Sequence, residues 1–221
     1  KQYGINFSVF LDGSVEKPNE YLIERGNPQI GTTEILKLDV TTMNVERTAR
    51  AADDEGFVIA DIRDGQLMVK EKLRATGDGW QVVREVRNRA TGNWEEHPQL
   101  GYPIKQRAAI DPLGFFDPDP NKLFVSTNRN SNFKQIQVYD IVSRAWEPEP
   151  AFASPDADIS DATALVDHEA KKIVGVGSYT IDGPAQHEIF ADDTWLAIQR
   201  GIESRFPGQN VTFIDTRRKL K

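Results

Sequence analysis

A short segment, GFFDPDPNKLFVSTNRN at positions 114–130, brings together two carboxylates and an arginine. Asp117 and Asp119 flank a proline, and carboxylate oxygens at this spacing can face one cation, although calcium takes about six to eight oxygens. Arg129 has a guanidinium that can hold a peptide carboxylate through paired hydrogen bonds, but a salt bridge within its loop is the interpretation that we favour. The same segment also suits a hairpin corner, in which Asp and Pro turn the chain. We favour the corner and keep Arg129 as the one candidate substrate-binding residue.

The three histidines are the other candidates for acid–base or metal chemistry. His97 follows two glutamates and His168 follows Asp167, so a carboxylate is close enough in sequence to orient either ring. Neither has a second histidine at the H-x-x-x-H spacing of metal-binding helices. We interpret His97, His168 and His187 as surface or turn residues, and we expect no catalytic residue, metal site or cofactor in this chain.

Acidic clusters and tryptophans allow further interpretations. Asp53–Glu55 suits a solvated loop, with a weak metal site as the alternative, and Asp192–Asp193 suits the start of a helix, where negative charge complements the dipole. The tryptophans would suit an aromatic platform for sugars, but all of them fall in expected strands or on an expected helix, so we predict core packing. They are Trp80, Trp94, Trp146 and Trp195.

The composition narrows the class of protein. The chain has 221 residues, a net charge of -7 and no cysteine. An acidic balance disfavours binding to nucleic acids or anionic membranes, because both need a dense basic surface. Disulfides, thiolate catalysis and cysteine-ligated zinc are excluded. No apolar run approaches the roughly 18 residues of a membrane-spanning helix.

Short apolar runs separated by turn residues dominate the sequence, which is the pattern of an all-β protein. Similar strands begin near Leu22, Leu67, Leu123 and Ile173. Their intervals of about 50 residues match the repeat length of propeller proteins. The strands that must position any functional residue therefore belong to a repeated unit.

A second landmark has nearly the same period. Asp39, Asn88 and Asp140 each follow an apolar strand and begin a turn. Side chains of Asp and Asn can accept hydrogen bonds from the backbone two residues further on, which closes such a turn. In the third unit, strands are expected at 113–116, 123–127, 135–140 and 145–147, with Phe115, Leu123 and Val125 in the core.

One four-stranded unit leaves apolar faces uncovered, so several units must stack around an axis. The sequence predicts a single, incomplete all-β propeller domain over 1–221, with about four four-stranded blades, one inserted α-helix and the start of another blade. The helix would carry Trp195, Ile198 and Ile202 on one face. The expected bounds are 5–50, 56–98, 108–148 and 158–190 for the blades, 193–205 for the helix and 211 for the next blade.

The segment 114–129, followed by QVYDI at 137–141, resembles a repeated pattern of the N-terminal β-propeller of prolyl oligopeptidase family serine peptidases. The pattern is a phenylalanine, a tight turn with Asp, an apolar strand, Ser-Asn-Arg, and then Tyr-Asp. EYLIERGNP at 20–28 with EILKLD at 34–39 looks like the same unit. The helix-bearing insertion at 192–207 resembles an insertion found in the bacterial acylaminoacyl-peptidase-like branch of this family. TolB-like propellers share much of this likeness.

The resemblance implies a non-catalytic domain, because catalysis in that family belongs to a separate C-terminal α/β-hydrolase domain. This chain has no G-x-S-x-G nucleophile motif, and the nearest string, GVGSY at 175–179, has the wrong spacing. The propeller would cap the hydrolase domain and filter peptide substrates. The alternatives are a TolB-like protein-binding scaffold and, further off, a propeller enzyme such as a metal-dependent hydrolase.

The expected partners follow from the same resemblance. They are the C-terminal α/β-hydrolase domain of the parent chain and peptide substrates, with neither nucleic acid nor membrane among them. An open arc of blades also exposes sheet edges, so we expect self-association through these edges. The compartment stays open between the bacterial periplasm and cytoplasm.

Overall fold

A computed structural model describes residues 8–13, 17, 19–27, 32–51, 55–61, 63–106, 109–167, 170, 172–180, 186–190 and 193–209. The chain divides into two compact units, Lys1–Arg107 and Ala108–Lys221. Strands make up most of the secondary structure of the described residues, as the sequence predicts.

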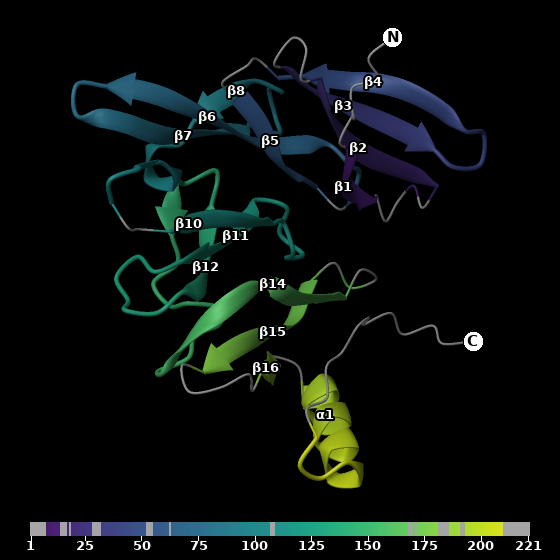
Figure 1. Ribbon diagram of the computed structural model, residues 1–221, viewed down its shortest axis with the longest axis vertical. Coiled ribbons are helices and arrows are strands. Elements are labelled where there is room, and N and C mark those ends of the chain that lie inside the picture. The colour runs from purple at the N-terminus through teal and green to yellow at the C-terminus, as the bar shows by residue number, and fades with distance from the viewer. Residues whose placement is uncertain are drawn as a thin grey trace. The chain divides into compact units, whose positions relative to one another are not determined.

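The first unit contains two antiparallel sheets (Figure 1). The strands of one sheet are β1 (Ser8–Gly13), β2 (Glu20–Asn27), β3 (Thr32–Asp39) and β4 (Asn44–Arg50). The strands of the other are β5 (Glu55–Ala60), β6 (Leu67–Thr76), β7 (Gly79–Arg87) and β8 (Trp94–Glu96), and β9 (Tyr102–Pro103) also pairs with β7. A 3-10 turn, η1 (Pro98–Leu100), lies between β8 and β9.

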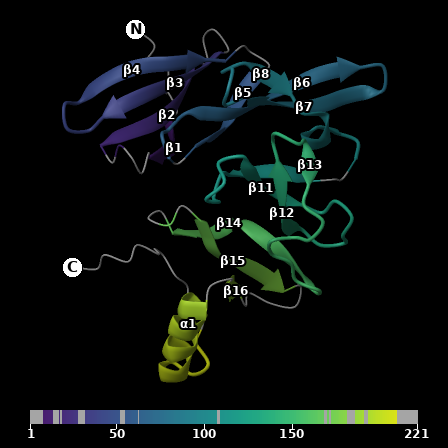
Figure 2. The ribbon, with the colours of Figure 1, turned by 180° about the vertical axis from the view of Figure 1, so that it is seen from behind.

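The second unit contains two more antiparallel sheets and the helix (Figure 2). One sheet has β10 (Ile110–Gly114), β11 (Lys122–Thr127), β12 (Gln135–Asp140) and β13 (Ala145–Trp146). The other has β14 (Ala157–Asp167), β15 (Lys172–Thr180) and β16 (Gln186–Phe190), so three of its strands lie among the described residues. The helix α1 (Asp193–Arg205) follows β16.

The strands of each sheet pair in the order in which they follow one another in the sequence, apart from β9. The four landmarks of the sequence repeat occupy one position in this pattern. They lie in the second strand of their sheets, namely Leu22 in β2, Leu67 in β6, Leu123 in β11 and Ile173 in β15.

Three of the sheets have the same turn between their third and fourth strands, as the Asx landmark predicts. Oδ1 of Asp39, Asn88 or Asp140 accepts hydrogen bonds from the backbone N–H groups two and three residues further on. The N–O distances are 2.8 and 3.1 Å for Asp39, 2.9 and 3.2 Å for Asn88, and 2.9 and 2.7 Å for Asp140. These bonds satisfy backbone donors that the strands leave unpaired.

Each of these turns ends with a residue of positive φ, four positions after the Asx residue. Met43 has a φ of 58°, Gly92 of 73° and Arg144 of 57°. Glycine adopts this conformation without steric cost, whereas a side chain does so only with strain. The turns at Met43 and Arg144 therefore store strain that the turn at Gly92 avoids.

The strand predicted at 113–116 begins earlier and ends at Gly114. β10 runs from Ile110 to Gly114, and its pairing with β11 is irregular between Pro112 and Gly114. Gly114 has a φ of 149°, and a Cβ there would lie 2.5 Å from the ring of Phe116. The chain thus leaves the sheet at Gly114, where the Phe116 ring needs a residue without a side chain.

The buried apolar side chains form cores, and in the first unit one core joins the two sheets. In the first unit, Leu22, Ile35, Ala60 and Leu67 form one apolar cluster. In the second unit, Phe115, Leu123 and Val125 have exposed fractions of 0%, as predicted.

The helix α1 spans the predicted residues but buries little of its apolar face. Trp195 is buried against Val174 of β15. Ile198 has an exposed fraction of 42%, and Phe206, just after the helix, of 50%. Of the predicted face, Trp195 is thus buried, Ile202 is half-buried and Ile198 is exposed. No helix among the described residues has the length and apolar composition to cross a membrane.

Candidate functional site

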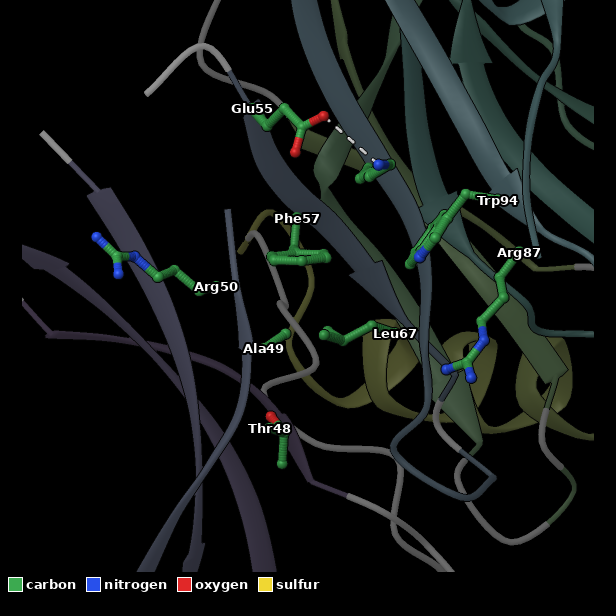
Figure 3. A pocket seen from close by; sticks show the side chains of 9 residues that line it. Thr48, Ala49, Arg50, Glu55, Phe57, Leu67, Arg87 and Trp94 are labelled. Carbon is green, nitrogen blue, oxygen red and sulfur yellow. Dashed lines mark hydrogen bonds and ion pairs between the residues drawn. The ribbon is translucent and has the colours of Figure 1, made fainter. Parts of the chain in front are cut away.

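A pocket of about 370 Å³ lies in the first unit, where β4 faces the sheet of β5 to β8 (Figure 3). It is lined by side chains that come from five strands. These are Thr48, Ala49 and Arg50 of β4, Glu55 and Phe57 of β5, Leu67 and Lys70 of β6, Arg87 of β7 and Trp94 of β8.

The strand register explains why these residues share one face. Phe57 pairs with Lys70 across β5 and β6, and Arg87 pairs with Trp94 across β7 and β8. Directly opposed residues in antiparallel strands point to the same side of a sheet. The alternation of side chains along the strands therefore delivers both aromatic and cationic groups to the pocket.

The middle of the pocket is apolar. Ala49, Phe57 and Trp94 are partly buried and pack against the core cluster that contains Leu67. The ring centroids of Phe57 and Trp94 are 6.1 Å apart, with the planes tilted by 52°. Such a tilted pair is a stable aromatic arrangement, so the apolar wall is held in place before any ligand binds.

Lys70 is a cation whose charge is already neutralised. Its Nζ lies 3.5 Å from Glu55 Oε1, 2.8 Å from Glu85 Oε2 and 5.2 Å from the Trp94 ring centroid. Partial burial alone would lower the pKa of Lys70, but the hydrogen bonds and charges of Glu85 and Glu55 outweigh it and raise this pKa. Lys70 therefore stays protonated and braces the pocket through its two glutamates.

Arg87 differs from Lys70 because no carboxylate of the described chain pairs with it. Its Nε donates a hydrogen bond to the Gly92 carbonyl oxygen at 3.2 Å, and no described residue accepts from its terminal nitrogens. Figure 3 shows the Arg87 guanidinium beside Leu67, whereas the side chain of Arg50 points away from Phe57 and Leu67. Arg87 thus places a guanidinium that no described carboxylate neutralises next to an apolar wall, an arrangement that suits an anion with an apolar body.

Arg129, the residue predicted to bind substrate, lies in the turn between β11 and β12 of the second unit. Its guanidinium carbon is 5.3 Å from the centroid of the Trp146 ring. Its backbone N–H donates to Thr127 Oγ1 at 3.0 Å. The favoured loop salt bridge is not found, because no carboxylate among the described residues pairs with Arg129. Its contacts are instead with the Trp146 ring and with Thr127 of the turn.

Asp117 and Asp119 form a corner, as predicted. Asp117 Oδ1 accepts a hydrogen bond from the Asp119 N–H at 2.8 Å, and Asp119 Oδ1 accepts one from the Asn121 N–H at 2.9 Å. These two consecutive Asx turns connect β10 to β11. Across the described ranges, no three acidic or histidine side chains are grouped to hold a metal ion.

His97 lies next to a turn, as predicted, but it is not at the surface. This residue has an exposed fraction of 3% and lies just before η1, where its N–H donates to the Arg84 carbonyl oxygen at 2.9 Å. The polar neighbours of His97 in the sequence do not predict this burial. His168 lies outside the described residues, and only the backbone of His187 is described, within β16.

The acidic clusters are described only in part. Asp53, Asp54 and Asp192 lie outside the described residues, and Asp193 begins α1. Glu55 is not a loop residue, because it begins β5 and its carboxylate forms an ion pair with Lys70. The strand therefore places it in the pocket.

Core packing is confirmed for one tryptophan and wrong for another. Trp195 is buried, and Trp94 and Trp146 are half-buried at their sheets. Trp80 has an exposed fraction of 56%, because it lies near the tip of the β6–β7 hairpin, beyond the ends of β5 and β8.

Sequence reasoning missed most of the pocket. Phe57, Lys70 and Arg87 were not singled out, and Trp94 was predicted only as a core residue. The available signal was the alternation within each strand, which puts Arg87 and Lys70 on a common face once the registers are known.

The chain matches no protein-family profile and none of the curated proteins. Among solved structures it is similar to TolB from Acinetobacter baumannii, with a TM-score of 0.52 and 10% identity, over 84% of this chain and 41% of that one. At this identity the likeness shows the fold alone. The sheets and this likeness define an all-β propeller fragment, in which α1 is the one α-helix of the described residues.

Two further solved structures have lower scores. One is an uncharacterized protein from Listeria monocytogenes EGD-e, with a TM-score of 0.44 and 13% identity, over 86% of this chain and 56% of that one. The other is the β-propeller domain of the Trilobed protease from Pyrococcus furiosus, with a TM-score of 0.33 and 14% identity, over 79% of this chain and 54% of that one. The chain thus spans about half the length of the structures that it matches.

Proposed function

We propose that this chain is the non-catalytic β-propeller part of a larger serine peptidase of the prolyl oligopeptidase type. In that protein it would cover an α/β-hydrolase domain, which would supply the Ser, Asp and His of acyl transfer. The propeller would limit access to the catalytic groups, so that short peptides enter and folded proteins do not.

The main support for the proposal is that the sequence pattern resembling the prolyl oligopeptidase family coincides with the strands of one sheet, β10 to β13. The segment 114–129 forms the end of β10, the double Asx turn and β11, and 137–141 lies in β12 and its turn. Phe115, Leu123 and Val125 of the pattern are buried, and its aspartates Asp117, Asp119 and Asp140 close turns. The agreement of this pattern with one four-stranded sheet supports a propeller of this family.

Arg129 is the proposed contact for a peptide carboxylate. The stacking on Trp146 holds the guanidinium in place, and no described carboxylate neutralises it. A guanidinium that is fixed in this way loses little entropy when it binds a carboxylate through two hydrogen bonds.

The test compares the full-length protein with the 221-residue chain. We expect the full-length protein to cleave acyl-peptide p-nitroanilides and to be inactivated by a fluorophosphonate serine reagent, while the 221-residue chain does neither. In the full-length protein, Arg129→Gln should raise KM several-fold and leave kcat nearly unchanged. Arg47→Gln, at an exposed position of β4, is the matched control.

A native reading frame without a downstream G-x-S-x-G segment would overturn the peptidase proposal. The remaining function would then be that of a protein-binding scaffold. Equal KM values for Arg129→Gln and the unaltered protein would overturn the role of Arg129 while leaving the peptidase assignment in place.

A further inference from the structure

We propose that the pocket of the first unit binds a small ligand with one carboxylate on an aromatic or branched apolar body, such as an N-acylated hydrophobic amino acid. The C-terminal residue of a peptide has the same chemistry. This inference concerns Arg87, Phe57, Leu67 and Trp94 and does not depend on the proposed peptidase function.

The size of the pocket agrees with a ligand of this kind. Its volume is about 370 Å³, and ligand pockets usually range from about 300 to 1,000 Å³. One aromatic amino acid with a small acyl group fits such a space, whereas a folded domain does not. The tilted Phe57–Trp94 pair offers a preformed wall for the apolar body of the ligand.

The charges of the pocket select an anion. Lys70 is neutralised by Glu55 and Glu85, so it adds no net attraction for a ligand. Arg87 uses only its Nε within the described chain, and its terminal nitrogens are free to hold both oxygens of a carboxylate. Arg87 as a residue is partly buried, and its Nε bond to Gly92 limits the orientations of the guanidinium.

The same charges limit the ligand to one carboxylate. Figure 3 shows Glu55 and Arg87 on different sides of the apolar middle formed by Phe57 and Leu67. A second anionic group near Glu55 would meet a like charge, which disfavours dicarboxylates. An amide N–H is tolerated there, because the Glu55 oxygens are hydrogen-bond acceptors.

The test is isothermal titration calorimetry of the 221-residue chain with N-acetyl-L-phenylalanine. Its primary amide, which lacks only the charge, is the matched ligand. We expect the acid to bind at least tenfold more tightly than the amide, and N-acetyl-L-aspartate to bind more weakly than either. Equal binding of acid and amide, or no binding of the acid at millimolar concentration, would overturn the proposal.

Two arginine variants locate the anion. Arg87→Gln should weaken binding of the acid at least tenfold and leave binding of the amide unchanged. Arg200→Gln is the matched control, since this arginine is exposed on α1 and does not line the pocket, and it should change the affinity less than twofold. Equal effects of the two substitutions would show only a general electrostatic attraction and would overturn the assignment of Arg87.

A second readout separates lost binding from lost folding. Thermal unfolding of Arg87→Gln should match that of the unaltered chain, because the substitution removes one partly exposed hydrogen bond. The indole N–H resonance of Trp94, assigned with Trp94→Phe, should shift on titration with the acid. If only the Trp80, Trp146 or Trp195 resonances shift, the ligand binds elsewhere and the proposal fails.

A further titration, with a peptide, tests whether the pocket receives the C-terminus of a peptide or a free acid. Acetyl-Ala-Ala-Phe with a free C-terminus should bind at least as tightly as N-acetyl-L-phenylalanine if the pocket receives peptide ends. Tenfold weaker binding of the peptide would assign the pocket to free acids. Both results support the carboxylate site, and they differ in the ligand that it serves.

Discussion

The guanidinium of Arg129 lies 5.3 Å from the ring centroid of Trp146, and the Trp146 ring lies 5.1 Å from that of Tyr139. Arg129 comes from the turn after β11, whereas Tyr139 and Trp146 form a cross-strand pair between β12 and β13. The stack thus fixes the turn that bears the family-like Asn-Arg sequence to the edge of its sheet. Burial raises the pKa of Tyr139 to about 12, so the stack stays uncharged at its inner end.

Substitution of Arg129 tests this stack. We expect Arg129→Gln to lower the free energy of unfolding by about 0.5–1 kcal/mol, because the cation–π contact is lost. Urea unfolding measures the change, and Trp146 fluorescence should shift to longer wavelength as water replaces the guanidinium. Arg129→Lys should retain part of the stability, whereas equal losses for Gln and Lys would contradict a contribution from the charge.

The ion pair of Asp140 with Lys122 predicts a pH-dependent stability. The two groups are 3.0 Å apart, and Asp140 also closes its Asx turn. Partial burial would raise the pKa of Asp140, but hydrogen bonds from Ser143 and Lys122 outweigh it and lower this pKa to about 2. A lowered carboxylate pKa stabilises the fold above the usual value of 3.8, and this stability is lost as the pH falls toward about 2.

Asp140→Asn should therefore lower the free energy of unfolding at pH 7 by about 1 kcal/mol, and the difference should vanish between about pH 4 and pH 2. Asn88 closes the equivalent turn of another sheet, so asparagine keeps the Asx bonds and removes only the charge. Asp140→Ala is the control that loses both the Asx-turn hydrogen bonds and the charge. It should lower the free energy of unfolding more than Asp140→Asn at every pH. A pH-independent cost of Asp140→Asn would contradict the role of the ion pair.

The strained turn at Met43 predicts a stabilising substitution. Met43 has a φ of 58° and an exposed fraction of 71%, so it forms few contacts that a glycine would lose. Met43→Gly should raise the free energy of unfolding by about 0.5–1 kcal/mol. Gly92→Ala, at the equivalent position, should lower the free energy of unfolding by a similar amount. Thermal unfolding measures both variants, and a Met43→Gly variant less stable than the unaltered chain would contradict the prediction.

A side chain at Gly101 should cause a steric clash, although the backbone conformation there suits any residue. Its φ of -90° is open to any residue, but a Cβ would lie 2.7 Å from the Val82 carbonyl oxygen. Gly101→Ala should lower the free energy of unfolding by about 1–3 kcal/mol, since the backbone of β7 or η1 must move. Gly56→Ala is the matched control, because nothing lies within 4 Å of its Cβ position, and it should be nearly neutral.

Much of the fold was predictable because its signals are local. Asp39, Asn88 and Asp140 close their turns with backbone groups only two and three residues away, so the sequence contains both partners of each bond. The bounds of β12 and α1 agree with the predictions for the same reason. The start of β10 was missed because it depends on pairing with β11 and on the Phe116 ring above Gly114.

The pocket was not predictable in the same way. Its aromatic wall joins Phe57 and Trp94, which are far apart in the sequence and meet only through the registers of four strands. The neutralisation of Lys70 by Glu55 and Glu85 depends on those registers too. Lys70 looks available in the sequence but is paired with glutamates in the fold, whereas no carboxylate among the described residues pairs with Arg87.

The sequential order of the strands also bears on how the chain reaches its native state. Strands that pair with their neighbours in the sequence close short loops, which lowers the entropy lost before contacts form and gives a low contact order. Each sheet can therefore form from about 50 residues of chain while the rest is still being synthesised. The Asx turns, which require no distant partner, are the natural places for that formation to begin.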